Sequence, residues 1–375
     1  MLLTALKFMR FDKPKSVGAL FGVIISIFLI GQQTGIFTFL TNAMCYYVRV
    51  NDSYVWVTDN KTENVNALAP IDVRLGYEIE SLPHVAKAHQ LVISAGAARF
   101  NDGTSAGMSV VGVELPEFNG IQDGIMFDGE AADLIPDGAV SVDFFDGKAL
   151  GKPEKGNYFE INGKQVYIAA VTKGARSFGG GLISYTTIAR ARFLGNLPVN
   201  KTSAFLVKVD EDKNMQEVVN YINANIPGVK AWMPKEFKNQ TILTVLKSSG
   251  IAFSFGTLII FALISGFIII GLTLYSAAID RIKDYGTLKA IGATNGYIRK
   301  LILMQAMLYA IVGFMIGYAL IEGFRNGIAN AGTLFSFPPV VKFAFFVITA
   351  VISISGTLFA IRRIAKLEPA SVFRT

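Results

Sequence analysis

Residues 280–300 read DRIKDYGTLKAIGATNGYIRK and lie between two long stretches that contain no Asp, Glu, Lys or Arg. Within this segment Ile282, Tyr285, Leu288 and Ile291 recur every three residues, with charged residues between them. This spacing is typical of a helix with one apolar side. A charged helical connection between two apolar stretches predicts an element that is held against a membrane and offers a docking surface to the adjacent compartment.

The whole chain has the composition of a membrane protein, with 52% hydrophobic residues and a mean hydropathy of +0.44. A bilayer span needs roughly 20 mostly apolar residues. The stretches without charged residues cover 16–48, 248–279, 301–321 and 343–361. They predict four transmembrane helices, at residues 16–41, 248–279, 301–321 and 341–361. The first stretch is too long for the apolar core of a signal peptide.

The distribution of Lys and Arg predicts the orientation of these helices. Basic residues gather before the first helix, between the second and third, and after the fourth, and such loops usually face the cytoplasm. We therefore expect a multi-pass membrane protein with both termini in the cytoplasm; the family resemblance described below implies the bacterial inner membrane. The segment 42–247 is expected outside, and because it is net acidic, the overall charge of +7 is a signal of topology and not of nucleic-acid binding.

The shorter segments follow from this layout. Residues 1–15 have one apolar side before Pro14 and predict an interfacial helix against the lipids of the cytoplasmic leaflet. Residues 322–340 are expected to form a short outer loop, and residues 362–375 a cytoplasmic tail.

Residues 42–247 predict an independent mixed α/β domain. Asn162-Gly163 separates two β-type runs and is the dipeptide that type I′ hairpins prefer. A helix is expected to run from about residue 235 through 250 into the second span. Other expected elements are strands at 54–58, 109–113 and 204–209, a helix or turn at 71–81, and a helix at 214–225.

No catalytic, metal or cofactor site is expected in this chain. The single Cys excludes an internal disulfide, and His84 and His89 have no Cys or carboxylate at ligand spacing near them in the sequence. The acidic residues of 123–137 lie among Gly and Pro, which favours a solvated loop. The Gly-rich segment 177–181 lacks the Lys and Ser/Thr of a phosphate-binding loop, and no such motif occurs anywhere in the sequence.

Small and polar residues inside the apolar stretches are candidates for helix packing. Glycines four residues apart allow close helix approach and can support dimerisation. Gln32 and Gln33 are adjacent amides in an apolar run, where they either bond across a helix interface or line the outer mouth of a cavity. We favour the first interpretation. The glycine pairs are Gly18 with Gly22, Gly31 with Gly35, and Gly313 with Gly317.

Two stretches resemble a known family. Residues 284–293, DYGTLKAIGA, are similar to the E-[IF]-G-x-L-[RK]-A-[IL]-G-A motif of MacB/FtsX-type ABC transporter permeases, and residues 363–374 resemble the family's C-terminal ending. The unfused chain and the Gln-Gln-Thr-Gly near the outer end of the first helix look most like the DevC branch. Asp284 stands where Glu is usual, and Gln305 where Glu is frequent.

The resemblance implies an α-helical membrane protein with four transmembrane helices and a mixed α/β extracytoplasmic domain, MacB-like and two-lobed, between helices 1 and 2. It implies that residues 280–300 contain a coupling helix that docks in a groove of a separate ABC ATPase, which binds the ATP and Mg. Tyr285, Leu288 and Ile291 would be its apolar anchors. The implied coupling residues are Asp284, Tyr285, Gly286, Leu288, Lys289, Ile291 and Gly292.

The resemblance also implies partners. A homodimer would work with a membrane-fusion adaptor and an outer-membrane channel to drive export by mechanotransmission, and the chain itself would not be an enzyme. Two alternatives keep the fold: a signalling mechanotransmitter that activates a cell-wall hydrolase, and a permease that extracts lipoproteins. An integral-membrane enzyme is disfavoured because the apolar stretches hold no His, Asp or Glu cluster. Lipids, glycolipids, peptides and drugs all remain candidate substrates.

Overall fold

The computed structural model describes residues 13–122, 124–146, 154–178, 181–330 and 332–365. It divides into two compact units, of which unit 1 comprises Met1–Thr38 with Ile251–Thr375, and unit 2 comprises Phe39–Gly250. Most of the predicted N-terminal interfacial helix, and the end of the chain that carries the second family motif, lie outside the described residues.

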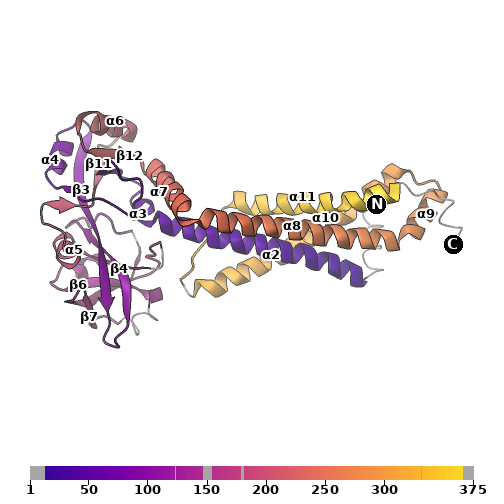
Figure 1. Ribbon diagram of the computed structural model, residues 1–375, viewed down its shortest axis with the longest axis horizontal. Coiled ribbons are helices and arrows are strands. Elements are labelled where there is room, and N and C mark those ends of the chain that lie inside the picture. The colour runs from indigo at the N-terminus through magenta and orange to yellow at the C-terminus, as the bar shows by residue number, and fades with distance from the viewer. Residues whose placement is uncertain (1–12, 123, 147–153, 179–180, 331, 366–375) are drawn as a thin grey trace. The chain divides into compact units, whose positions relative to one another are not determined.

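Unit 1 is built from long helices (Figure 1). Its elements are α2 (Lys13–Met44, continuing into unit 2), α8 (Ile251–Asp280), α9 (Ile282–Ala290), α10 (Asn295–Ala329) and α11 (Pro339–Ala365). Pro14 lies in the first turn of α2, where a missing N–H costs nothing.

Three helices of the described residues are long and apolar enough to cross a membrane, over Ser16–Met44, Ile251–Ile269 and Asn295–Ala329. These agree with three of the four predicted spans. The fourth predicted span is helical as α11, but its apolar stretch covers the shorter range Pro339–Ser355. A fourth crossing therefore stays a prediction.

The glycines of the predicted packing motifs face other parts of unit 1. A Cβ atom added at Gly22, Gly31, Gly35 or Gly313 would lie 2.2–2.5 Å from a neighbouring side-chain atom, and one added at Gly317 would lie 3.1 Å away, so the helices approach closely at these glycines. The motifs are thus used within one chain, and a homodimer would need another surface. Gly18, Gln32 and Gln33 are half-buried on α2. The contacts join Gly22 to Ile269, Gly31 to Ile321, Gly35 to Phe335, Gly313 to Val23 and Gly317 to Ile27.

Unit 2 contains a ten-stranded sheet with the order β12-β1-β11-β3-β7-β8-β5, from which β4, β6 and β9 branch. A separate pair joins β2 (Ile71–Asp72) and β10 (Lys201–Thr202). The strands of the large sheet are β1 (Val55–Asp59), β3 (Val85–Arg99), β4 (Ser105–Val113), β5 (Met126–Asp128), β6 (Ala139–Asp143), β7 (Tyr158–Ile161), β8 (Lys164–Thr172), β9 (Leu182–Thr187), β11 (Ala204–Val209) and β12 (Val229–Trp232).

Short helices complete this unit. They are α3 (Tyr46–Val50), α4 (Leu75–Glu80), α5 (Ile188–Gly195), α6 (Met215–Asn225) and α7 (Pro234–Ser249), with 3₁₀ turns η1 (Ala131–Leu134) and η2 (Phe144–Asp146). The predicted hairpin is present as β7–β8: Asn162 and Gly163 both have positive φ, 51° and 72°, as a type I′ turn requires.

The strand β3 organises the sheet. Over Val85–Leu91 it pairs with β11, and over Val92–Arg99 with β4. One hydrophobic cluster lies around β1, β11, β12 and α6, and a second around β4, β6 to β9 and α5. Two core regions therefore share one long strand.

One predicted element is wrong. The helix expected to run from residue 235 into the second span is broken, because α7 ends at Ser249, Gly250 has a φ of 65°, and α8 begins at Ile251. A glycine in the left-handed conformation is the commonest way to end a helix.

Candidate functional site

The predicted coupling segment forms a short helix, a tight turn and the start of a second helix. At the end of α9 the Ala293 N–H donates to the Leu288 carbonyl at 2.8 Å, and the Gly292 N–H donates to the Lys289 carbonyl at 3.1 Å. With φ of 98° at Gly292, this is a Schellman ending. Thr294 then caps α10, its hydroxyl accepting from the Tyr297 N–H at 3.2 Å.

The turn therefore explains part of the family motif. Gly292 adopts a conformation that a side chain would strain, and its backbone completes the hydrogen bonds that α9 leaves open. The single helical repeat inferred from residues 282–291 is corrected, since α9 ends at Ala290 and Ile291 is its C-terminal cap.

Tyr285 fixes α9 to α10. Its side chain is 1% exposed and packs with Ile298, Leu301 and Ile302 of α10. This burial raises the pKa of the phenol to about 12, while a hydrogen bond with Gln305 acts in the opposite direction. Tyr285 was expected to anchor a partner, but its side of α9 is already covered by α10 of the same chain.

The remaining coupling residues differ in how far they are exposed. Ile291 is 76% exposed, whereas Leu288 is half-buried against the Tyr285 cluster. Asp284 is exposed, Lys289 is half-buried and Gly286 is buried. The surface available to a partner therefore consists of one fully presented apolar side chain, at the end of a helix, among charged ones.

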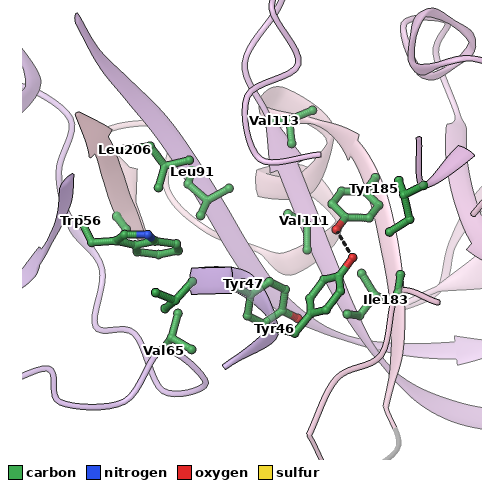
Figure 2. Packing of buried hydrophobic residues seen from close by; sticks show 14 of the residues in the cluster. Tyr46, Tyr47, Trp56, Val65, Leu91, Val111, Val113, Ile183, Tyr185 and Leu206 are labelled. Atoms are coloured by element: carbon green, nitrogen blue, oxygen red, sulfur yellow. Dashed lines mark hydrogen bonds between the residues drawn. The ribbon is translucent and has the colours of Figure 1, made fainter. Parts of the chain in front are cut away.

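A second candidate site lies in unit 2, where the chain arrives from α2 and leaves through α7. Tyr46 and Tyr47 of α3 are buried in the central core, and the Tyr46 hydroxyl lies 2.8 Å from that of Tyr185 (Figure 2). Phe237 of α7 is fully buried in the same core, with ring centroids 5.6 Å from Trp56 and 5.4 Å from Trp232.

One loop ties both junctions together. The Asn66 side chain donates to the carbonyl of Met44, the last residue of α2, at 2.7 Å. The neighbouring Val65 N–H donates to the Thr241 hydroxyl of α7 at 3.1 Å. Sequence reasoning missed this site, because Tyr46 and Tyr47 follow an apolar run and resemble the end of a membrane span.

Within the described residues, no group of three or more His, Cys, Asp or Glu is arranged to hold a metal ion. The fold does bring a carboxylate to His89 that sequence spacing missed: its Nδ1 lies 3.0 Å from Glu114 Oε2. This hydrogen bond lowers the pKa of Glu114. A buried His–Glu pair of this kind satisfies two polar groups and offers no ligand set.

Comparisons with known proteins find a family similarity for part of the chain. Residues 256–369 match the family described as FtsX-like permease C-terminal. Among solved structures, similarity is found to the extracellular domain of the ABC-type transporter YknZ from Gram-positive bacteria, with 14% identity over 48% of this chain and 98% of the other and a TM-score of 0.35. The periplasmic region of MacB from Actinobacillus actinomycetemcomitans matches with 10% identity, over 51% and 94% of the two chains, and a TM-score of 0.38. No curated protein matches.

Proposed function

Residues 256–369 form an FtsX-like permease C-terminal domain, and from this premise we propose that the chain is the permease subunit of an ABC exporter. The MacB/FtsX-type resemblance inferred from residues 284–293 is confirmed for this part of the chain. The subunit would carry motion from a separate ATPase, which binds ATP and Mg, to the extracytoplasmic unit 2.

The observation that carries the proposal is the construction of α9. Buried Tyr285 holds this helix against α10, and exposed Ile291 is presented at its Schellman end. A docking element must be rigid toward its own span and apolar toward its partner, because otherwise the partner's movement is lost in local rearrangement. Both requirements are supported by these contacts.

The outer junctions support the other half of the proposal. Motion that reaches α2 or α8 can pass along the chain into unit 2, and both chain crossings enter one aromatic core, through α3 and α7. A close-packed core transmits displacement as a unit. Mechanotransmission to unit 2 is thus the function that the arrangement favours.

Further parts of the proposal come from the sequence. We propose a homodimer in the bacterial inner membrane with cytoplasmic termini, a fourth span in α11, and a membrane-fusion adaptor with an outer-membrane channel as in the DevC branch. The glycine contacts within unit 1 direct any dimer contact to other surfaces.

The test replaces Ile291 with Asp and measures co-purification of the co-expressed ABC ATPase. Burying one Ile is worth roughly 1.5 to 3 kcal/mol, so the bound ATPase should fall about tenfold or more. Thr287→Asp is the matched control, since it places the same charge on an exposed position of α9. Equal retention of the ATPase by Ile291→Asp and the unmodified chain, with membrane insertion intact, would refute docking through α9.

A further inference from the structure

A cavity in unit 2 lies between α5 and the β7–β8 hairpin, and none of the residues that line it belongs to either candidate site described above. Its volume is about 470 Å³, within the range of roughly 300 to 1,000 Å³ that is usual for small-molecule sites. Its walls include Tyr158, Tyr167 and Phe193, and its polar groups include Asp137, Gln165 and Arg190.

Aromatic rings form the open part of this cavity. Tyr158 and Tyr167 are partners across the hairpin, with ring centroids 5.8 Å apart. Tyr158 is 55% exposed and Phe193 of α5 is 61% exposed. The Lys164 ammonium holds the third ring in place, since it lies 4.2 Å from the Phe193 ring centroid and 2.6 Å from Asn196 Oδ1. Exposed rings fixed beside a hollow offer flat apolar faces to a ligand.

The polar part of the cavity includes the guanidinium of Arg190, which has a hydrogen-bond donor without an acceptor. The Arg190 side chain is only 13% exposed and pairs through Nη2 with the fully exposed Asp137. Its Nε is buried without a hydrogen-bond partner. A buried donor left unpaired is costly, so an acceptor from a ligand would be favourable here.

The aromatic rings and the Asp137–Arg190 pair together indicate which class of ligand fits this cavity. The charges of Asp137 and Arg190 compensate each other, so an ionised ligand would compete with one of them. An entirely apolar ligand would leave the Arg190 donor unpaired. We propose that this cavity binds a neutral sugar ring, whose C–H face packs on the aromatic rings and whose hydroxyls bond to Asp137, Gln165 and Arg190.

Two sources share this chemistry: a glycan polymer outside the membrane and the sugar headgroup of a glycolipid. The inference does not rest on the transport function, because the sugar can be bound as cargo or as a fixed attachment point. Failure of ATPase docking at Ile291 would leave it untouched.

The experiment uses the full chain in a detergent without a sugar headgroup and saturation-transfer NMR. The probes are an N-acetylglucosamine trimer and a short-chain glucosyl lipid. Transfer to sugar-ring protons is expected with at least one probe, and Tyr158→Ala and Phe193→Ala should each weaken binding about tenfold. Tighter binding of the trimer indicates the polymer, and tighter binding of the lipid indicates the headgroup.

Phe127→Ala is the matched control, because Phe127 is 54% exposed and does not line the cavity. Both test positions are exposed enough to leave folding intact, which unchanged burial of the Cys45 thiol in each variant would verify. The proposal is overturned if neither probe binds, if the control weakens binding equally, or if glucuronate binds better than glucose.

Discussion

The two segments that join unit 2 to the rest of the chain are held in its core by different contacts. At the first, α2 runs to Met44 and the chain passes through buried Cys45 into α3, where paired tyrosine hydroxyls lie within the core. At the second, α7 is held by the stacking of Phe237 with Trp232, and the helix then breaks at Gly250. The first junction is held by a hydrogen bond between two tyrosines after a continuous helix, which we call the polar lock. The second is held by aromatic stacking and lies beside the helix break at Gly250, which we call the hinge. The chain thus enters unit 2 along a continuous helix, α2, and leaves it where a helix ends, at Gly250.

The largest effect should come from removing the apolar attachment. Phe237→Ala leaves a cavity between Trp56 and Trp232 and should lower the free energy of unfolding of unit 2 by about 3 to 5 kcal/mol. Urea titration of the full chain in detergent measures this loss. Because both junctions share one core, maleimide labelling of Cys45 should also accelerate. Leu243→Ala, a 45% exposed position of the same helix, is the control, and equal effects of the two variants would contradict the comparison.

A smaller effect is expected at the polar lock. Tyr46→Phe leaves the buried Tyr185 hydroxyl without its partner and should destabilise unit 2 by about 1 to 3 kcal/mol. The Tyr46→Phe/Tyr185→Phe double variant removes both hydroxyls and should recover most of that loss. Tyr77→Phe, at a 76% exposed position, should be nearly neutral. A double variant that adds two independent losses would show that the hydroxyl pair is not the lock.

The smallest effect concerns the hinge. Gly250→Ala meets no neighbouring atom, so its cost is only that of a side chain in the left-handed conformation, about 1 to 2 kcal/mol. Thermal unfolding of the full chain measures it. Gly256→Ala, also in open space but within α8, should cost nothing and stabilise slightly, by about 0.5 to 1 kcal/mol, because Ala favours the helix more than Gly does. Stabilisation by Gly250→Ala would mean that α7 and α8 prefer one continuous helix, and the proposed difference between the junctions would disappear.

Local rules made some of these features predictable from the sequence. The dipeptide Asn162-Gly163 was enough to predict the hairpin, and length and lack of charge were enough to predict three apolar helices. The β3 strand was missed because VAKAHQLVISAGAAR is rich in Ala, which is depleted in strands, and contains few β-branched or aromatic residues. The inward position of Tyr285 was missed because three-residue spacing defines a helix side but not which neighbour covers it.

The sugar cavity could not be predicted for a related reason. Asp137, Tyr158 and Arg190 come from different elements, and each alone reads as an ordinary surface residue. Only the pairing of β7 with β8 and the placement of α5 bring them together. The same holds for His89 and Glu114, which lie on β3 and in the loop after β4.

The long strand β3 has a consequence for cooperativity. Leu91 and Val92 are buried at the point where β3 changes partner from β11 to β4. If either half of the sheet opened, β3 would lose the backbone partners of that half while remaining paired in the other. The two core regions are therefore expected to unfold in one transition, with the slowest amide hydrogen exchange of unit 2 at these two residues.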